Sequence, residues 1–478
     1  MKKSSQTHTR TERDALGAVQ IPVNAYFGSA TARALKNFQI SGLTAPKSFQ
    51  KALGMVKLAA AKANLKLNLL EKKHEKALLQ ACEEFIDGKF SAEFTLDAIQ
   101  AGAGTSYNMN ANEIIANRAN ELLGGKKGQY KHIHPNNHVN LAQSTNDVIP
   151  TATRIALLLQ LPTLLAEIKN LEKELAKKTK TYAHTIKVGR THLQDAVPTT
   201  FGQEFDAYKE AISASREFII QQAQNLQILG IGGTALGTGI NTDPGYQKLM
   251  IQNLSALMRT RFKPAKNLTE TTHNMTVFLN FSAALRSLAV NLLNISNDLK
   301  IMAMGPKAGI NEIHLPEVQP GSSIMPGKVN PSIVESMEMT CMQVLGNDRT
   351  IELAAQKSQL DLNVFAPIIL YNILQSTEIL TAALKIFTNL CIKGLTVNKS
   401  QASHLFETSL ITATALAPYI GYAKTAEIVK NALKNKRTIR EEVLKSHLYT
   451  EKELDEILSI PRTTKPSKLK KELIKKPQ

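Results

Sequence analysis

The stretch FLNFSAALRSLAVNLLNISNDLKIM, residues 278–302, decides the fold class. Its apolar side chains recur with gaps that alternate between three and four residues, and this spacing predicts one long helix. The positions that share this spacing are Phe278, Phe281, Leu285, Leu288, Leu292, Ile295, Leu299 and Met302. Further apolar residues, Ala283, Val290 and Leu293, lie off the stripe. We therefore expect other helices to surround this one.

Similar helical spacing appears elsewhere in the chain. It runs through Leu164, Ile168, Leu171 and Leu175, through Phe205, Tyr208, Ile212, Ile219 and Leu226, and through Ile373, Leu380, Leu384, Phe387 and Cys391. The 478 residues are 43% hydrophobic but only 5% aromatic, with no tryptophan, which suits Ala/Leu-rich helices better than a turn-dense β protein. The sequence thus predicts a mainly helical, all-α fold. Long helices that are apolar on several faces favour a homo-oligomer, with a thick monomeric bundle as the alternative.

Composition also limits where the protein works and what it binds. Three widely spaced cysteines indicate a reducing compartment, and the most apolar run, residues 155–161, is far shorter than the roughly 20 residues of a membrane span. We expect a soluble, cytoplasmic protein that does not bind membranes. The net charge of +18 would favour anionic partners, and part of it lies in the basic tail from residue 462 to 478. No aromatic residue is interleaved there to stack on bases, so we expect a solvated tail rather than a nucleic-acid arm.

Four polar segments without an apolar period separate the predicted helices, and we expect them to be loops that carry the site. They are AGAGTSYNMNAN (101–112), HIHPNNHVNLAQSTNDVIP (132–150), VGRTHLQDAVPTTFGQE (188–204) and PGSSIMPGKVNP (320–331). Their hydroxyls and amides can hold carboxylates by neutral hydrogen bonds, and Lys328 with Arg190 could supply positive charge. Small dicarboxylates fit this inventory. Each residue alone would more often be a helix cap or a turn residue.

Two other interpretations of these segments, and one of the glycine-rich stretch at 230–241, fail. The 320–331 segment departs from a phosphate loop because five residues separate Gly321 from Gly327 and Val329 replaces the hydroxyl residue. In GIGGTALGTGIN, residues 230–241, Ala235 stands where a dinucleotide motif needs its third glycine. His132, His134 and His138 lack helical spacing and nearby Cys or carboxylate ligands, so we expect hydrogen-bonded loop histidines. We expect neither a cofactor nor a metal.

GSSIMPGKVNP at 321–331 resembles the signature of the aspartase/fumarase superfamily, lyases that release fumarate by eliminating ammonia, water or another group. The resemblance extends to GRTHLQDAVP (189–198), QSTND (143–147), AGTSYNMNANEIIANRA (103–119) and GTALGTGIN (233–241), and it covers the chain from about residue 14 to about residue 460. It implies a fold of three helical regions whose long central helices join in a homotetramer, with each active site built from three subunits.

The resemblance also implies roles for individual residues. Ser322 would be the base that removes a proton beside a carboxylate, and Lys328 and Asn330 would bind the carboxylate next to the departing group. Thr105, Ser144, Thr145 and Ser323 would stabilise the aci-carboxylate formed when the proton leaves. Asn146, Thr191 and His192 would hold the leaving group, His192 acting catalytically beside Ser322 and Lys328. Ser106 completes the substrate-binding set.

The leaving group is the point on which the members of this superfamily differ. Ala103, Ser106, Thr145 and GNDRT at 346–350 resemble the ammonia-releasing members that act on L-aspartate. His134 with Pro135, NVFAP at 363–367, and Glu335 in the place of the fumarase glutamate are partly fumarase-like. We expect release of ammonia from L-aspartate to give fumarate, with a class II fumarate hydratase as the alternative. A catalytically silent scaffold or nucleic-acid binder is disfavoured because Ser322, Lys328 and Asn330 are intact.

The same resemblance suggests how the chain is divided. We expect an N-terminal helical domain (1–146), a central long-helix domain (147–400) that contains the 320–331 signature loop, a small C-terminal helical domain (401–461) and the basic tail (462–478).

Overall fold

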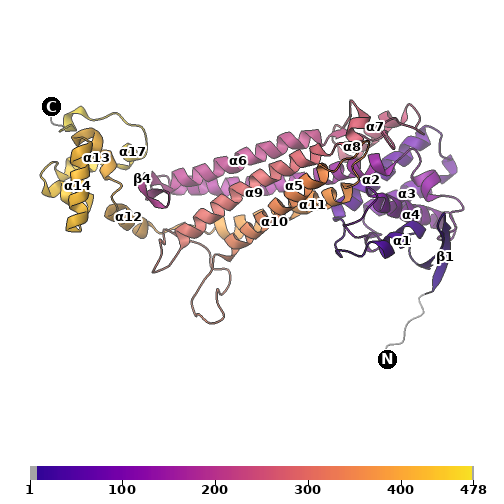
Figure 1. The fold of residues 1–478 in the computed structure, drawn as a ribbon, viewed down its shortest axis with the longest axis horizontal. Coiled ribbons are helices and arrows are strands. Elements are labelled where there is room, and N and C mark those ends of the chain that lie inside the picture. The colour runs from indigo at the N-terminus through magenta and orange to yellow at the C-terminus, as the bar shows by residue number, and fades with distance from the viewer. Residues whose placement is uncertain (1–7, 476–478) are drawn as a thin grey trace. The chain divides into compact units, whose positions relative to one another are not determined.

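The computed structural model describes residues 8–475, and its fold is mainly helical, as the sequence predicts. Helices account for 60% of the chain, and the strands are short (Figure 1). The α-helices are α1 Ser29–Asn37, α2 Lys47–Lys66, α3 Glu75–Ile86, α4 Thr105–Leu122, α5 Thr145–Thr181, α6 Phe201–Asn225, α7 Tyr246–Met258, α8 Leu268–His273, α9 Thr276–Ala303, α10 Ser332–Ala355, α11 Ala366–Phe387, α12 Lys399–Thr408, α13 Ala413–Ile420, α14 Tyr422–Asn435, α15 Ile439–Lys445, α16 Glu451–Ile457 and α17 Ile460–Thr463.

Short strand pairs and single helical turns connect these helices. The strands pair as β1 Thr9–Asp14 with β2 Gly17–Pro22, β3 Ile186–Thr191 with β4 Gln194–Thr200, β5 Ile228–Leu229 with β6 Lys263–Pro264, and β7 Ile313–His314 with β8 Thr396–Val397. Only the β5–β6 pair is parallel among the described strands. The single turns are Lys72–His74, Ser91–Glu93 and Lys471–Leu473 of 3₁₀ type, and Pro135–Val139 and Thr388–Ile392 of π type.

The stripe that decides the fold class forms α9, whose bounds extend the predicted 278–302 stretch by two residues at the start and one at the end. All eight stripe residues are buried, none with more than 4% of its surface exposed. The other predicted helices are α5, α6 and α11. Leu226 lies just beyond the end of α6, and Cys391 lies in the π-type turn after α11. The long helices that the apolar periodicity predicts are therefore confirmed.

The chain forms two compact units. One contains the residues up to Ala166, Ser215–Ala289 and Thr340–Thr381; the other contains Glu167–Ala214, Val290–Met339 and the residues from Ala382 onward. The boundary falls within the long helices α5, α6, α9, α10 and α11. The four-part division expected from the sequence stays a prediction.

In the first unit, an aromatic cluster fixes α4 against α2 and α3. Tyr107 of α4 packs its ring 5.4 Å from Phe49 of α2 and 5.6 Å from Phe94, and Phe85 of α3 lies 5.8 Å from Phe94. These rings are buried, and aromatic pairs at such separations stabilise packing beyond the area that they bury. The start of α4, which carries Thr105, is thereby held on a rigid base.

In the second unit, α13–α16 enclose a small hydrophobic core. The ribbon of these helices lies in the yellow part of the colour range in Figure 1. Threonines begin α15 and α16, and in each helix a glutamate three residues later returns a hydrogen bond to the cap, so both starts are capping boxes. Leu473 is buried in the same core, and the Tyr449 hydroxyl donates to its carbonyl at 2.8 Å. The prediction of a solvated tail is therefore wrong at Leu473, because this apolar side chain is buried in the core.

Two helices, α5 and α9, are long and apolar enough to cross a membrane by length and composition. Of their most apolar 18-residue windows, 67% is buried in α5 and 44% in α9. Core helices of soluble proteins satisfy the same test, so these two helices are weak evidence for a membrane span. The cysteines Cys82, Cys341 and Cys391 are free and buried.

Candidate active site

The first part of the site is the start of α4, where three successive residues adopt left-handed backbone conformations. Gly102, Ala103 and Gly104 have φ angles of 92°, 55° and 95°. A side chain at Gly104 would also meet Ile149 at 2.9 Å, so glycine is required there by both conformation and space. This turn brings the chain into α4 with the Thr105 hydroxyl donating to the Gly102 carbonyl at 2.7 Å.

The start of α5 lies against this turn, so two predicted substrate-binding threonines meet. The Thr105 and Thr145 hydroxyl oxygens lie 3.2 Å apart, within hydrogen-bond distance, and these residues are the first of α4 and α5. Helix N-termini carry partial positive charge and free amide donors, which attract anions. The structure therefore places two hydroxyls and two helix N-termini together, an arrangement that can hold a carboxylate.

The loop before α5 is fixed by a buried carboxylate that our sequence analysis did not single out. Asp147 accepts hydrogen bonds at 3.0 Å from the backbone amides of Ser144, Gly232 and Thr234. It thereby joins the QSTND segment to the glycine-rich stretch at 230–241. Burial raises the pKa of Asp147 to about 6 against the opposing effect of these amides.

Ser144 and Asn146 are positioned by the same loop. The Asn146 amide donates to the Ser144 hydroxyl at 3.2 Å, and the Asn146 side chain donates to the carbonyl of Ala235 at 2.8 Å. Ser106 follows Thr105 in the first turn of α4 and is half-buried. Within residues 8–475, no hydrogen bond joins the Ser106 hydroxyl to the Thr105–Thr145 pair.

Beneath the threonine pair lies Lys57 of α2, a fully buried cation that the sequence analysis also missed. Its ammonium donates to the side-chain carbonyls of Asn108 at 2.6 Å, Gln143 at 2.9 Å and Asn140 at 3.2 Å. Asn108 in turn donates to the Thr145 hydroxyl at 3.4 Å. Burial lowers the pKa of Lys57 to about 7, although the nearby Asp147 opposes this. A lysine within the apolar run GMVKLAAA was the signal that could have revealed it.

The second unit carries the other predicted residues, first on the β3–β4 hairpin. His192 and Leu193 form its two-residue turn with φ angles of 55° and 57°, and Thr191 pairs with Gln194 across it. Thr191 and His192 are exposed at this tip. The segment was predicted to be a loop, but it forms paired strands in which Val188, Pro198 and Thr200 are buried.

Arg190 does not provide a free positive charge. Its guanidinium makes two hydrogen bonds to Glu312, at 2.9 and 3.0 Å, and Glu312 is fully buried. Bidentate pairing of this kind occupies the guanidinium fork. The expectation that Arg190 supplies charge to a substrate is therefore wrong, because a distant carboxylate from the segment before β7 takes it.

The 320–331 loop closes on itself at its base. Gly321 donates to the Lys328 carbonyl at 2.8 Å, and the Asn330 side chain donates to the Gly321 carbonyl at 2.8 Å. A side chain at Gly321 would meet that Lys328 carbonyl at 2.6 Å, so only glycine allows the closure. Between these ends, Ser323 and Lys328 are exposed.

Ser322 is the best-defined chemical group of this loop. Its Oγ accepts hydrogen bonds from the backbone amides of Met325 at 3.0 Å and Ile324 at 3.2 Å. Two aligned amides are the donors that lower the energy of a negatively charged oxygen. The two amides would therefore stabilise a negative charge on the Ser322 oxygen.

The loop histidines make hydrogen bonds, as the sequence predicts for His134 and His138. The His134 ring accepts from the Asn136 and Asn137 amides, and the His138 ring accepts from the His134 amide at 2.8 Å. Across residues 8–475, no group of three or more His, Cys, Asp or Glu side chains could hold a metal ion.

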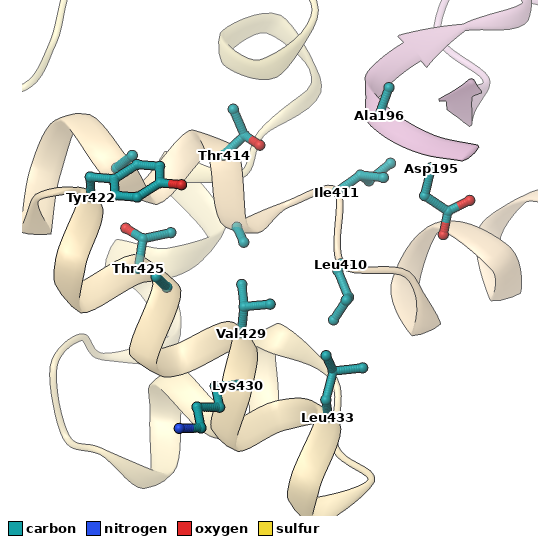
Figure 2. A pocket seen from close by; sticks show the side chains of 13 residues that line it. Asp195, Ala196, Leu410, Ile411, Thr414, Tyr422, Thr425, Val429, Lys430 and Leu433 are labelled. Carbon is teal, nitrogen blue, oxygen red and sulfur yellow. The ribbon is translucent and has the colours of Figure 1, made fainter. Parts of the chain in front are cut away.

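A cavity of the second unit contains no residue of the 320–331 loop. It measures about 670 Å³ and lies between α13, α14 and the start of β4 (Figure 2). Leu410, Val429 and Leu433 give it an apolar wall, while Tyr422 and Lys430 lie at its edges. Of the motif segments it includes only Asp195 and Ala196, which follow the hairpin turn, so none of the predicted site residues lines it.

Comparison with known proteins decides the family. A protein-family model described as "Lyase" matches residues 17–346, and one described as "Fumarase C C-terminus" matches residues 413–464. The chain belongs to the aspartase/fumarase superfamily. The resemblance that the motifs indicated is therefore confirmed.

Superfamily relatives match nearly the whole chain. Aspartate ammonia-lyase of Pseudomonas aeruginosa is 47% identical, covering 94% of this chain and 96% of the relative. The Bacillus sp enzyme of the same name is 44% identical, covering 96% and 98%. Fumarate hydratase class II of Brucella suis is 43% identical, covering 96% and 99%. A fumarate lyase:delta crystallin structure from Brucella melitensis, bound to cobalt, matches with a TM-score of 0.93 and 44% identity, covering 96% of this chain and all of that one.

Proposed function

We propose that this protein is an aspartate ammonia-lyase, which reversibly eliminates ammonia from L-aspartate to give fumarate. The observation that carries the proposal is the pairing of Thr105 with Thr145 at two helix N-termini, which suits a substrate carboxylate. Threonine at 145 and alanine at 103 favour the ammonia-releasing members, and relatives at 44–47% identity carry that name. The alternative is a class II fumarate hydratase, the name of a relative at 43% identity.

The chemistry begins with the proton on the carbon beside one carboxylate. Ser322, held as an oxyanion by the Ile324 and Met325 amides, takes this proton and becomes a hydroxyl. The electron pair of the broken C–H bond moves into the carboxylate, giving the dianionic aci form. Hydroxyls such as Thr105 and Thr145, with Ser144 and Ser323, stabilise this charge as it develops.

The second step breaks the carbon–nitrogen bond. The aci-carboxylate returns its electron pair to form the carbon–carbon double bond, and the nitrogen leaves with the bonding pair as ammonia. Asn146, Thr191 and His192 hold the departing amine, while Lys328 and Asn330 bind the neighbouring carboxylate. Ser322 then releases its proton, so fumarate, ammonia and one proton balance the L-aspartate consumed.

We also propose that the enzyme is a cytoplasmic homotetramer whose active sites combine residues of three subunits. It belongs to a family of soluble enzymes. Much apolar surface on the long helices supports assembly: Val290 of α9 is 42% exposed, and Met339 and Met342 of α10 are 68% and 60% exposed. Burial of such residues between copies would remove their contact with water.

The substrate assignment has a direct test. We expect the ultraviolet absorbance of fumarate to rise when the purified protein is given L-aspartate, and not when it is given L-malate. Ammonia should appear in equal amount. A rise with L-malate alone would mean that the protein is a fumarate hydratase and that Ala103 and Thr145 are misleading.

Lys57→Met should lower kcat by about tenfold or more, because three side-chain carbonyls lose their shared donor and Asn108 no longer holds the Thr145 hydroxyl. Steady-state kinetics with L-aspartate would measure this. Lys66→Met, at the exposed end of the same helix, is the matched control and should leave kcat and KM unchanged. Unchanged kinetics in folded Lys57→Met would contradict the positioning role.

A further inference from the structure

A small cavity in the first unit lies apart from the threonine pair. Its volume is about 150 Å³, which leaves room for several water molecules or one small solute. It is formed by the end of α6, strand β5, α8 and the start of α9, with one residue from α5. Its polar lining includes Arg154, Asn225, Glu270 and Asn274. This volume is too small for a nucleotide or a drug-sized molecule.

Arg154 of α5 is a buried cation in the wall of this cavity that makes no ion pair with a described residue. It is 97% buried, since only 3% of its surface is exposed. Its guanidinium donates to the Pro150 carbonyl of its own helix at 3.3 Å and lies 4.9 Å from the centre of the Phe278 ring, while Nε has no hydrogen-bond partner. Among residues 8–475, no carboxylate lies within ion-pair distance of it.

A buried cation with so few partners is costly, and burial lowers the pKa of Arg154 to about 10, although the charge of Glu270 opposes this. A guanidinium presents several donors in a planar fork that matches a carboxylate with two parallel hydrogen bonds. A small carboxylate in the cavity would supply the acceptor that the described residues do not.

Glu270 of α8, an exposed residue, provides the opposite charge at the same cavity. Its carboxylate accepts a hydrogen bond from the Asn274 side chain at 2.7 Å, and it makes no ion pair with any described Lys, Arg or His. Arg154 and Glu270 therefore line one small space, carry opposite charges and do not pair with each other. A ligand with a carboxylate at one end and an ammonium at the other satisfies both.

We propose that this cavity is a binding site for a small free amino acid, whose carboxylate pairs with Arg154 and whose ammonium pairs with Glu270. The site lies on residues to which the elimination chemistry assigns no role. It stands independently of the proposed function, because none of its evidence depends on the identity of the substrate.

Because the chain contains no tryptophan, Ile228→Trp places a unique fluorescent reporter at the cavity in the full-length protein. Titration with L-alanine should give a saturable change in emission. Propionate, which lacks the ammonium, and ethylamine, which lacks the carboxylate, should bind at least tenfold more weakly. L-Alanine is used because it has a single carboxylate and is a poor match for a dicarboxylate site.

Two variants in the reporter background assign the charges. Arg154→Met should weaken L-alanine binding at least tenfold, and Glu270→Gln should reduce L-alanine to the affinity of propionate. Lys266→Met, which removes an exposed charge that does not line the cavity, is the control and should bind as the reporter protein does. The proposal would be overturned if L-alanine gave no saturable change even at concentrations well above millimolar. It would also be overturned if Arg154→Met bound L-alanine as tightly as the reporter protein does.

Thermal unfolding without the reporter gives a second measurement. L-Alanine should raise the midpoint of the wild-type protein but not that of Arg154→Met. Without ligand, Arg154→Met should unfold no earlier than wild type, because it removes an unpaired buried charge. If it instead unfolds earlier or dissociates the oligomer, Arg154 is held by the fold or by a carboxylate of a second copy, and the amino-acid site is wrong.

Discussion

Ser322→Ala is expected to lower kcat by about 10²- to 10⁴-fold, the usual contribution of a positioned proton acceptor. The Ile324 and Met325 amides both donate to the Ser322 oxygen. Alanine has no oxygen at this position, so no atom is left there to take the proton from the substrate carbon. KM for L-aspartate should change much less, since the carboxylate-binding residues remain. Steady-state kinetics that separate kcat from KM would measure both effects.

The fold should survive this substitution. The loop is closed by Gly321 with Lys328 and Asn330, whose hydrogen bonds do not involve the Ser322 side chain. Ser323→Ala is the matched comparison: it removes a neighbouring exposed hydroxyl, and we expect a smaller loss, on the order of tenfold. Near-normal turnover in a folded Ser322→Ala oligomer, checked by sedimentation, would exclude Ser322 as the base.

The long helices were predictable because their buried residues recur at a regular spacing within a short stretch of sequence. In α9, a buried stripe and additional apolar residues specify a helix whose neighbours are other helices, and this needs no knowledge of which neighbours they are. The family motifs extended that prediction to a fold class. Such information is present within about 25 consecutive residues.

The polar segments were predicted less well, since their structure depends on partners distant in the sequence. Residues 101–112 were predicted to be a loop, but from Thr105 onward they form α4, in which Asn108, Asn110 and Asn112 are buried. The next residue of the helix, Glu113, is buried too. Glu113 accepts hydrogen bonds from Gly28, Ala30 and Thr31. A carboxylate buried by the N-terminal segment cannot be distinguished from a solvated one by local pattern.

The candidate site shows the same division. Motif chemistry identified Thr105 and Thr145, and the structure brings their hydroxyls together. The motifs did not identify Lys57, which lies 48 residues before Thr105. They also predicted that Arg190 supplies charge to a substrate, whereas its guanidinium is paired with Glu312. Residue type predicts which groups can bind a carboxylate, but only the fold decides which of them are already occupied.

Asp147→Ala should lower the free energy of unfolding by about 2–4 kcal/mol, because the buried amides of Ser144, Gly232 and Thr234 lose their acceptor. Each unsatisfied buried donor costs about 1–3 kcal/mol, while removing the carboxylate also removes its own burial penalty, which raises its pKa to about 6. The two effects oppose each other, so we expect less than the sum of three lost hydrogen bonds.

Denaturant unfolding at one fixed protein concentration would measure this loss, since assembly also contributes to stability. Hydrogen exchange should accelerate at the Gly232 and Thr234 amides, which a general loss of stability would not single out. Asp361→Ala, at an exposed carboxylate, is the control and should change neither quantity. Activity should fall together with stability in Asp147→Ala, because the same carboxylate fixes the loop that carries Ser144, Thr145 and Asn146. Full activity with unprotected Gly232 and Thr234 amides would show that the substrate does not need this loop to be fixed in advance.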